Sequence, residues 1–324
     1  MGSVQATKRS TTGIRMSQGP TQEHGRQATR LLARPRIIAR TLLRQSAVSL
    51  ILLFPPFAFA LVEREWQLVA ATGVPALVAV AVHFSTRGKP PPEDLRRVEA
   101  VLVLVFIFLL SCIMTFPSFL VLGMNPVDAI FEATSAVTTT GLSVAANVDD
   151  WPVSAHVLRA WTQWCGGLVM AIAGLALLLR PGPTSRILGS VEIDERNILS
   201  STRFHARQLL LAYLALSAFG VVGAGVLVPG YWEGPVLALA AVSTGGFAPR
   251  TDSLASYSLA AKMFLVLLSL LGSMSLLVYV VALKTGLTAA LNSAAIRVFG
   301  RVILFSTAVY VVVHVFFMAR IQVC

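Results

Sequence analysis

Seven long apolar segments restrict the folds that are open to this chain. They cover residues 46–62, 67–84, 101–122, 155–179, 208–228, 259–283 and 302–318. A helix needs roughly 20 apolar residues to cross the ~30 Å hydrocarbon core of a bilayer, and 56% of the 324 residues are hydrophobic while only 13% are charged. Because backbone polar groups in lipid must be satisfied within the segment, spans of this length are helices. We therefore predict an all-α polytopic membrane protein, built as a helical bundle.

The formal net charge of +11 is distributed unevenly along the chain. If the N-terminus is cytoplasmic and the seven segments alternate in direction, 21 of the 26 Lys and Arg residues fall on the cytoplasmic side. Loops rich in Lys and Arg stay on that side of a membrane. The distribution predicts a multi-pass protein of the plasma (inner) membrane with its N-terminus inside, and it argues against nucleic acid as a partner.

An internal repeat organises the apolar part of the chain. The order full span, short apolar segment, Thr/Gly stretch and full span occurs from residue 101 and recurs from residue 208. Residues 1–45 are a basic cytoplasmic tail, which we expect to be disordered unless it is an organelle-targeting segment. Residues 46–100 form a helix pair and a cytoplasmic loop, and residues 101–180 form the first helix/pore-loop/helix repeat. A cytoplasmic loop (181–207), the second repeat (208–284), and a further cytoplasmic loop with a seventh helix (285–324) complete the division.

The two short segments, 126–137 and 235–242, cannot cross a bilayer. At 1.5 Å per residue they reach about 18 Å and about 12 Å. Each has a proline in its first turn, where the missing N–H is not needed, and Asn125 can cap the first. They must enter the membrane and return, so that the negative end of each helix dipole points inward, which favours a cation there.

The sequences TTTG and STGG end these short segments. Glycine adopts positive φ and lets neighbouring carbonyls turn toward an axis, while Thr and Ser hydroxyls add oxygen ligands. Rings of such oxygens can replace the hydration shell of a cation. We predict a filter for a cation at Thr138, Thr139, Thr140, Gly141, Ser243, Thr244, Gly245 and Gly246.

Three stretches, FEATSAVTTTGLS, LRAWTQWCGGLVMAI and AVSTGGFAPRTDSL, resemble the Trk/Ktr/HKT superfamily of potassium transporters and its TrkH-like membrane subunits. The resemblance runs from about residue 47 to residue 319. It implies K⁺ uptake through one pore, driven by the membrane potential, with one filter glycine per repeat; by position these are Gly141 and Gly246. It also implies a cytosolic nucleotide-binding regulatory subunit as partner, which we expect to dock on the basic segments 180–207 and 284–301.

The family arranges four pore loops around its path, whereas this sequence holds two. We expect a truncated or split gene product rather than a self-sufficient homodimer. A homodimer or a second pore-forming chain would be needed to complete four loops. The alternative function is a non-transporting half, or an accessory membrane subunit of a cation transporter. The sequence shows no nucleophile–base pair, no phosphate-binding Gly-rich loop and no His/Cys ligand spacing, so we expect no enzyme activity and no bound cofactor beyond transported K⁺.

Three acids stand near the predicted filter. Glu132 lies inside the first short segment. We predict that it braces the filter by accepting backbone N–H groups, with extension to the membrane interface as the alternative. Asp149 and Asp150 follow the first filter on the predicted outer face. There they either attract cations at the outer mouth or belong to an ordinary solvated loop.

Two arginines also lie near the filter segments. Arg250 places a positive charge near the outer mouth, and we expect Asp252 to neutralise it. Arg159 shares a helix face with Gln163. We expect Arg159 to extend to the membrane interface, with Trp161 and Trp164 as interfacial anchors.

Overall fold

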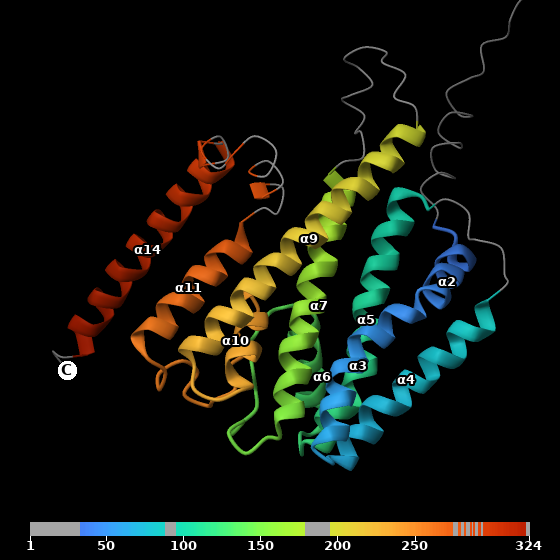
Figure 1. Cartoon of the computed structure of the whole chain (residues 1–324), viewed down its shortest axis with the longest axis horizontal. Coiled ribbons are helices and arrows are strands. Elements are labelled where there is room, and N and C mark those ends of the chain that lie inside the picture. Colours follow the sequence, from blue (N-terminus) through green and yellow to red (C-terminus); the bar gives the residue numbers. More distant parts are fainter. Residues whose placement is uncertain are drawn as a thin grey trace, which may run out of the picture.

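The computed structural model describes residues 33–87, 95–178, 195–274 and 294–321, together with single positions between 278 and 292. These residues form helices that run side by side as a bundle (Figure 1). In chain order the helices are α2 (Pro35–Arg44), α3 (Ser46–Val62), α4 (Trp66–Thr86), α5 (Arg97–Val121), α6 (Pro126–Val137), α7 (Val153–Leu178), α9 (Glu195–Leu227), α10 (Glu233–Val242), α11 (Leu259–Ser273) and α14 (Ala294–Ile321).

Each apolar segment of the sequence contains a helix, but the predicted span 259–283 is described as helix α11 only to Ser273. The bounds of α3 and α6 are those predicted, 46–62 and 126–137. Within the described residues, five helical stretches are long and apolar enough to cross a membrane: Pro35–Val62, Trp66–Thr86, Val98–Val121, Ala206–Leu227 and Ile296–Val315. The prediction of an all-α polytopic membrane protein is confirmed.

Three segments that we predicted to lie outside helices are helical. Residues 35–44 of the predicted disordered tail form α2, residues 195–207 begin α9, and residues 294–301 begin α14. The predictions were wrong because they ended each helix where the apolar composition ends. An α-helix satisfies its backbone internally and can therefore continue past the apolar region. Residues 1–32 and 181–194 lie outside the described residues.

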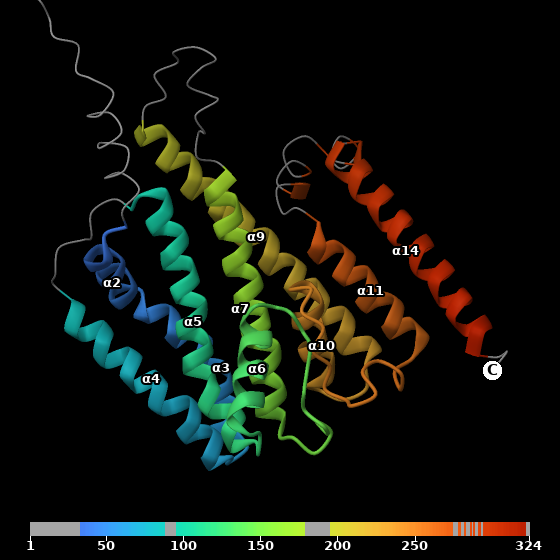
Figure 2. The same cartoon turned by 180° about the vertical axis from the view of Figure 1, so that it is seen from behind.

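Helix α7 is the centre of the bundle. It packs against α3 and α5 on one side and against α9 and α10 on the other, and it also contacts the short helix α6. Figure 2 shows α7 between these groups of helices. Because α6 and α10 both contact α7, this helix brings the ends of the two short helices together.

The N-terminal helices α3 and α4 form an antiparallel pair beside α7. The pair packs closely, since a Cβ at Gly73 would lie 3.1 Å from the ring of Phe57. Glu63 Oε2 accepts a hydrogen bond from the backbone N–H of Ser154 (3.0 Å), which joins the turn after α3 to the start of α7. The indole N–H of Trp161 donates to the carbonyl oxygen of Ile51 (2.9 Å).

A core of buried side chains holds α7, α9, α10 and α11 together. The Tyr213 hydroxyl donates to the carbonyl oxygen of Trp164 (3.0 Å), and the Trp164 indole N–H donates to Ser217 Oγ (2.8 Å). Gly220 and Gly223 allow α11 to lie close to α9, because Cβ atoms there would overlap Leu268 and Phe264. In contrast, the apolar stretch Ile296–Val315 of α14 has no buried residue.

Candidate functional site

The site is built at the C-terminal ends of α6 and α10. Helix α6 begins at Pro126, and the side-chain oxygen of Asn125 accepts hydrogen bonds from the N–H groups of Val127 and Asp128 (3.0 Å each). This is an N-cap, which satisfies donors that have no partner within the helix. Helix α10 begins at Glu233, two residues before the predicted start of this short segment, and has no side-chain cap.

Both short helices end in the same hydrogen-bonded turn. In the first, the N–H of Thr139 donates to Ala136 O (3.3 Å) and the N–H of Thr140 donates to Ser135 O (3.0 Å). In the second, the N–H of Thr244 donates to Ala241 O (3.0 Å) and the N–H of Gly245 donates to Ala240 O (2.8 Å). This pair of bonds defines the Schellman motif, which ends a helix through one residue of left-handed conformation.

Threonine occupies the left-handed position in both turns, with φ of 58° at Thr139 and 53° at Thr244. Glycine is the usual residue there, because left-handed backbone costs an L-residue about 1–2 kcal/mol and is rarest for β-branched side chains. Two residues later, Gly141 and Gly246 have φ of 74° and 95°. The two loops therefore follow one backbone path, and such strain is typical of functional segments.

The two loops are in direct backbone contact. A Cβ on Gly141 would overlap the carbonyl oxygen of Gly245 and would lie 3.1 Å from the Cα of Gly246. A Cβ on Gly245 would in turn overlap the side chain of Gln163, which is buried on α7. Side chains are thus excluded from the contact between the loops, and peptide groups face one another.

Each short helix rests on a glycine of the next helix in the chain. A Cβ on Gly166 of α7 would overlap the carbonyl oxygen of Val137, the last residue of α6. A Cβ on Gly272 of α11 would overlap the carbonyl oxygen of Val242, the last residue of α10. The same close support therefore lies behind both loops.

The hydroxyl groups at the helix ends are directed back to the helices. Thr138 Oγ1 donates to Thr134 O (2.7 Å), and the equivalent Ser243 Oγ donates to Leu239 O (3.0 Å). Thr138 Oγ1 also lies 2.7 Å from Thr140 Oγ1. Thr138, Thr140, Thr244 and Gly246 are exposed, whereas Ser243 and Gly245 are buried. The exposed polar groups of the two loops therefore come from Thr138, Thr140, Thr244 and Gly246.

A buried ion pair joins the first loop to α7. Arg159 Nη2 lies 2.9 Å from Glu132 Oε1, and the exposed fractions of these side chains are 3% and 0%. Glu132 also accepts hydrogen bonds from Ser143 Oγ (2.9 and 3.1 Å) and from the N–H of Val144 (3.3 Å). The carboxylate thus links α6, the chain after Gly141 and α7.

The same arginine contacts the second loop. Arg159 Nη1 donates to the carbonyl oxygen of Ala248 (3.3 Å), and its guanidinium carbon lies 3.9 Å from the ring centre of Phe247. The expectation that Arg159 and Trp164 reach the interface was wrong, since both are buried. A charge within an apolar segment finds a partner in the protein interior when another helix supplies one, and Glu132 does so here.

The segments beyond the two glycines are joined at the predicted outer mouth. The N–H of Thr251 donates to Asp149 Oδ1 (2.7 Å), and Thr251 Oγ1 donates to Asn147 Oδ1 (3.1 Å). Asp150 Oδ2 accepts from the side-chain amide of Asn147 (2.7 Å). Asp149 therefore connects the two loops, while Asp150 bonds within its own loop, and both side chains remain exposed to solvent.

Arg250 pairs with Glu233, at the start of α10, and not with Asp252. Its Nη2 lies 3.2 Å from Glu233 Oε1, while Asp252 accepts from Ser256 Oγ (3.4 Å). The expected pairing with Asp252 was wrong, because the return of the loop brings residue 250 back to the first turn of α10. Tyr257 donates to Glu233 Oε2 (2.6 Å). Burial and this bond raise the pKa of Tyr257 above its ordinary value, so its hydroxyl stays protonated and donates over a wider pH range.

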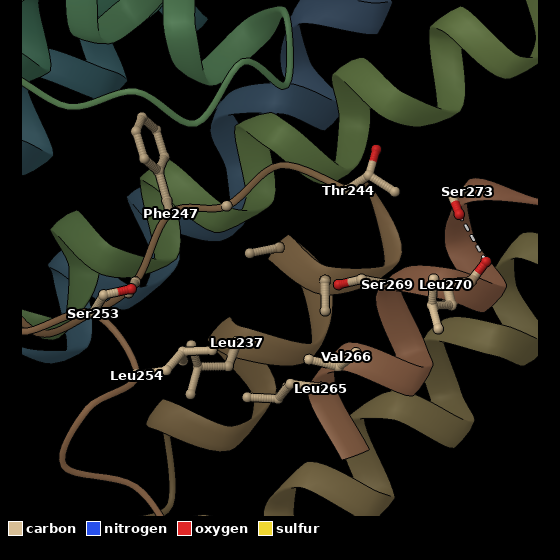
Figure 3. Close-up of a pocket in the computed structure, with 14 residues that line it drawn as sticks. Leu237, Thr244, Phe247, Ser253, Leu254, Leu265, Val266, Ser269, Leu270 and Ser273 are labelled. Atoms are coloured by element: carbon tan, nitrogen blue, oxygen red, sulfur yellow. Dashed lines mark hydrogen bonds between the residues drawn. The ribbon is translucent and has the colours of Figure 1, made fainter. Parts of the chain in front are cut away.

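A cavity of about 390 Å³ opens on the far side of the second loop. Figure 3 shows Thr244 and Phe247 of the loop on one side of it and Leu265 and Val266 of α11 on the other. Gly246 also lines this space. The second loop is therefore covered by the first loop on one side and is open on the other.

The support behind the first loop can be tested with two glycines of α7. Gly166→Ala should destabilise the protein by about 1–3 kcal/mol, because the new methyl group would overlap the backbone of Val137. Gly174→Ala is the matched control, since a Cβ there meets nothing within 4 Å. It should be neutral or stabilising by up to about 1 kcal/mol. Thermal unfolding in detergent measures both, and equal stabilities would contradict the contact.

The buried ion pair predicts strong coupling. Arg159→Met leaves the Glu132 carboxylate buried without its partner and should cost about 3–5 kcal/mol. Glu132→Gln combined with Arg159→Met should cost less than the sum of the single changes by about 1–3 kcal/mol. Arg250→Met is the control, because that side chain is 40% exposed, and it should cost about 1 kcal/mol or less. Additive losses at residues 132 and 159 would refute the coupling.

Comparison with known proteins identifies the family. The TrkH family of cation transport proteins matches residues 69–285. A Trk system potassium uptake protein, TrkG, of Escherichia coli is 26% identical over 222 residues, which are 64% of this chain and 44% of the relative. TrkI of Halomonas elongata, also a Trk system potassium uptake protein, is 29% identical over 150 residues, or 43% and 29%.

An uncharacterized cation transporter of Methanocaldococcus jannaschii is 26% identical over 187 residues, which are 57% of this chain and 38% of the relative. The chain thus spans less than half the length of these three relatives. The family match covers both short helices and both loops, and it includes α4 to α11 almost entirely. The chain belongs to the TrkH family of cation transport proteins.

Proposed function

We propose that this chain forms part of a membrane pathway for K⁺ or another monovalent cation. The proposed ligands are backbone oxygens of Thr138 to Gly141 and of Ser243 to Gly246. The observation that carries the proposal is the matched left-handed backbone of the two loops, which meet at the ends of two short helices. The relatives named as potassium uptake proteins support K⁺ as the ion.

The electrostatics of the loops suit a cation. Each short helix directs its C-terminal end at its loop, and a helix C-terminus carries the equivalent of about half a negative charge. The Schellman bonds use the carbonyls of Ser135, Ala136, Ala240 and Ala241, which precede the proposed ligands. Among the loop carbonyls, Ser243 O accepts a hydrogen bond from Thr244 Oγ1 (2.7 Å) and keeps a second lone pair for an ion. Such carbonyls can replace the water around an ion that enters the loops.

The membrane potential is the proposed driving force. It supplies about 2.3 kcal/mol per elementary charge per 100 mV, so a passive pathway needs no nucleotide hydrolysis in this chain. In this proposal the plasma membrane holds the chain with its N-terminus in the cytoplasm. Asp149 and Asp150 then lie at the outer mouth, where exposed carboxylates raise the local concentration of cations.

A pathway needs protein on every side, and two loops enclose it on one side only. We propose that a second copy or another pore-forming chain completes it. The open cavity beside Thr244 and the exposed apolar side chains of α11, including Met263 and Val266, support that face as the joining surface. A cytosolic nucleotide-binding subunit is the proposed regulator, at the basic segments 180–207 and 284–301.

Binding of K⁺ can be measured on the purified chain. In detergent at constant ionic strength, replacing choline by K⁺ should raise the unfolding temperature, since a ligand that binds only the folded state stabilises it by about 2.7 kcal/mol at 100 times Kd. Gly141→Ala should abolish this gain, because residue 141 has a positive φ and no room for a Cβ. Growth of cells without their own K⁺ uptake, on limiting K⁺, tests transport.

Gly230→Ala provides the control for backbone strain. Gly230 also has a positive φ, 91°, but a Cβ there meets nothing within 4 Å and the residue lies outside both loops. It should lower stability while leaving the K⁺-dependent gain intact. Equal stabilisation by K⁺ and choline, or K⁺-dependent growth that survives Gly141→Ala combined with Gly246→Ala, would overturn the proposal.

A further inference from the structure

Helix α2 carries a row of exposed arginines. Arg36, Arg40 and Arg44 recur every four residues, so they lie along one face of the helix. All three are exposed, and none has an ion-pair partner among the residues that the structure describes. A row of uncompensated positive charge is costly unless water or an anion faces it.

The start of α2 is held by a buried carboxylate. Glu99, with an exposed fraction of 0%, accepts from Arg34 Nε (2.8 Å) and Arg34 Nη2 (2.8 Å), and also from the backbone N–H groups of Arg34 and Arg96. Such a two-pronged pair is rigid as well as strong. It fixes α2 against the start of α5. Because the Glu99 carboxylate is occupied by Arg34, it does not compensate the charges of Arg36, Arg40 and Arg44.

The position of α2 along the bundle corresponds to the bilayer surface. Helix α3 has 17 residues and so reaches about 25 Å, close to the ~30 Å thickness of the hydrocarbon core. The helix breaks between α2 and α3 at Gln45, and α2 lies at the end of the bundle where α5 begins (Figure 1). A short helix with one basic and one apolar face is suited to the level of the lipid headgroups.

An apolar cavity of about 590 Å³ lies beside the arginine row, between α2, α4 and α5. Helix α2 contributes Ala39, Leu42 and Leu43 to its lining. Leu43 follows Arg40 by three positions and Arg36 by seven, so the basic and apolar faces of the helix adjoin there. Ser46 also lines the cavity, and its buried hydroxyl has no hydrogen-bond partner among the described residues. Positive charge therefore borders a space that is lined almost entirely by hydrocarbon.

We propose that α2 and this cavity bind an anionic phospholipid, whose phosphate contacts Arg40 and Arg44 and whose acyl chain enters the cavity. The two chemistries of the site are those of one amphiphile. A soluble anion would leave the apolar cavity empty, and an acidic protein segment would have to bury its polar backbone there. Each basic residue near a membrane surface contributes about fivefold to the binding of anionic lipid.

The test measures lipid binding and not transport, so its result is independent of the proposed cation pathway. Phosphatidylglycerol is titrated into the detergent-solubilised chain, and bound lipid is counted by native mass spectrometry. Arg40→Gln with Arg44→Gln should weaken binding about 25-fold. The charge-matched control, Arg297→Gln with Arg301→Gln on the exposed face of α14, should change it less than twofold.

A second variant tests the cavity without changing the charge. Ala39→Phe fills the space beside α2 from an exposed position, and it should weaken phosphatidylglycerol binding about tenfold. Phosphatidylcholine should bind the original chain more weakly than phosphatidylglycerol, and glycerol phosphate should not compete. Unchanged binding after the α2 double change or after Ala39→Phe would overturn the proposal. An equal loss in the α14 control, or competition by glycerol phosphate, would also overturn it.

Discussion

The ion pair between Glu132 and Arg159 fixes the relation between the two halves of the site. Neither charge can remain alone inside an apolar bundle, so each holds the other in place. Glu132 then fixes the chain that follows Gly141, and Arg159 fixes the chain that follows Gly246. The bond from Thr251 to Asp149 repeats this connection at the solvent side. A displacement of either loop must therefore displace the other.

Small residues decide how closely the loops can be surrounded. Gly166 and Gly272 place the backbones of α7 and α11 against the last carbonyls of α6 and α10. Gly141 and Gly245 do the same between the loops. Where the two loops meet each other and their supporting helices, backbone thus lies directly against backbone, which is the arrangement that lets carbonyl oxygens serve as ligands for an ion.

The sequence was sufficient for the elements of the fold and for the short helices, because apolar length, proline position and the N-cap are local signals. The bounds of α6 follow from Asn125, Pro126 and the threonines alone. The sequence was not sufficient for partners distant in the chain. Arg159 has an acceptor 27 positions earlier, and Arg250 turns back to Glu233 and away from the nearby Asp252. The contacts of Gln163 and Gly272 with the loops could be recognised only from the structure. For Arg159 the sequence held a usable sign, because a charge within an apolar helix needs a partner. The filter role of the loop residues stays a prediction.

Threonine at the left-handed position has a consequence for the freedom of the loops. A glycine at residue 139 or 244 would relieve the strain, but it would also give the peptide groups beside it many more accessible orientations. A β-branched residue that is held in a rare conformation by its neighbours has few alternatives within reach. The loops then lose little conformational entropy when an ion arrives, because most of that ordering has already occurred during folding.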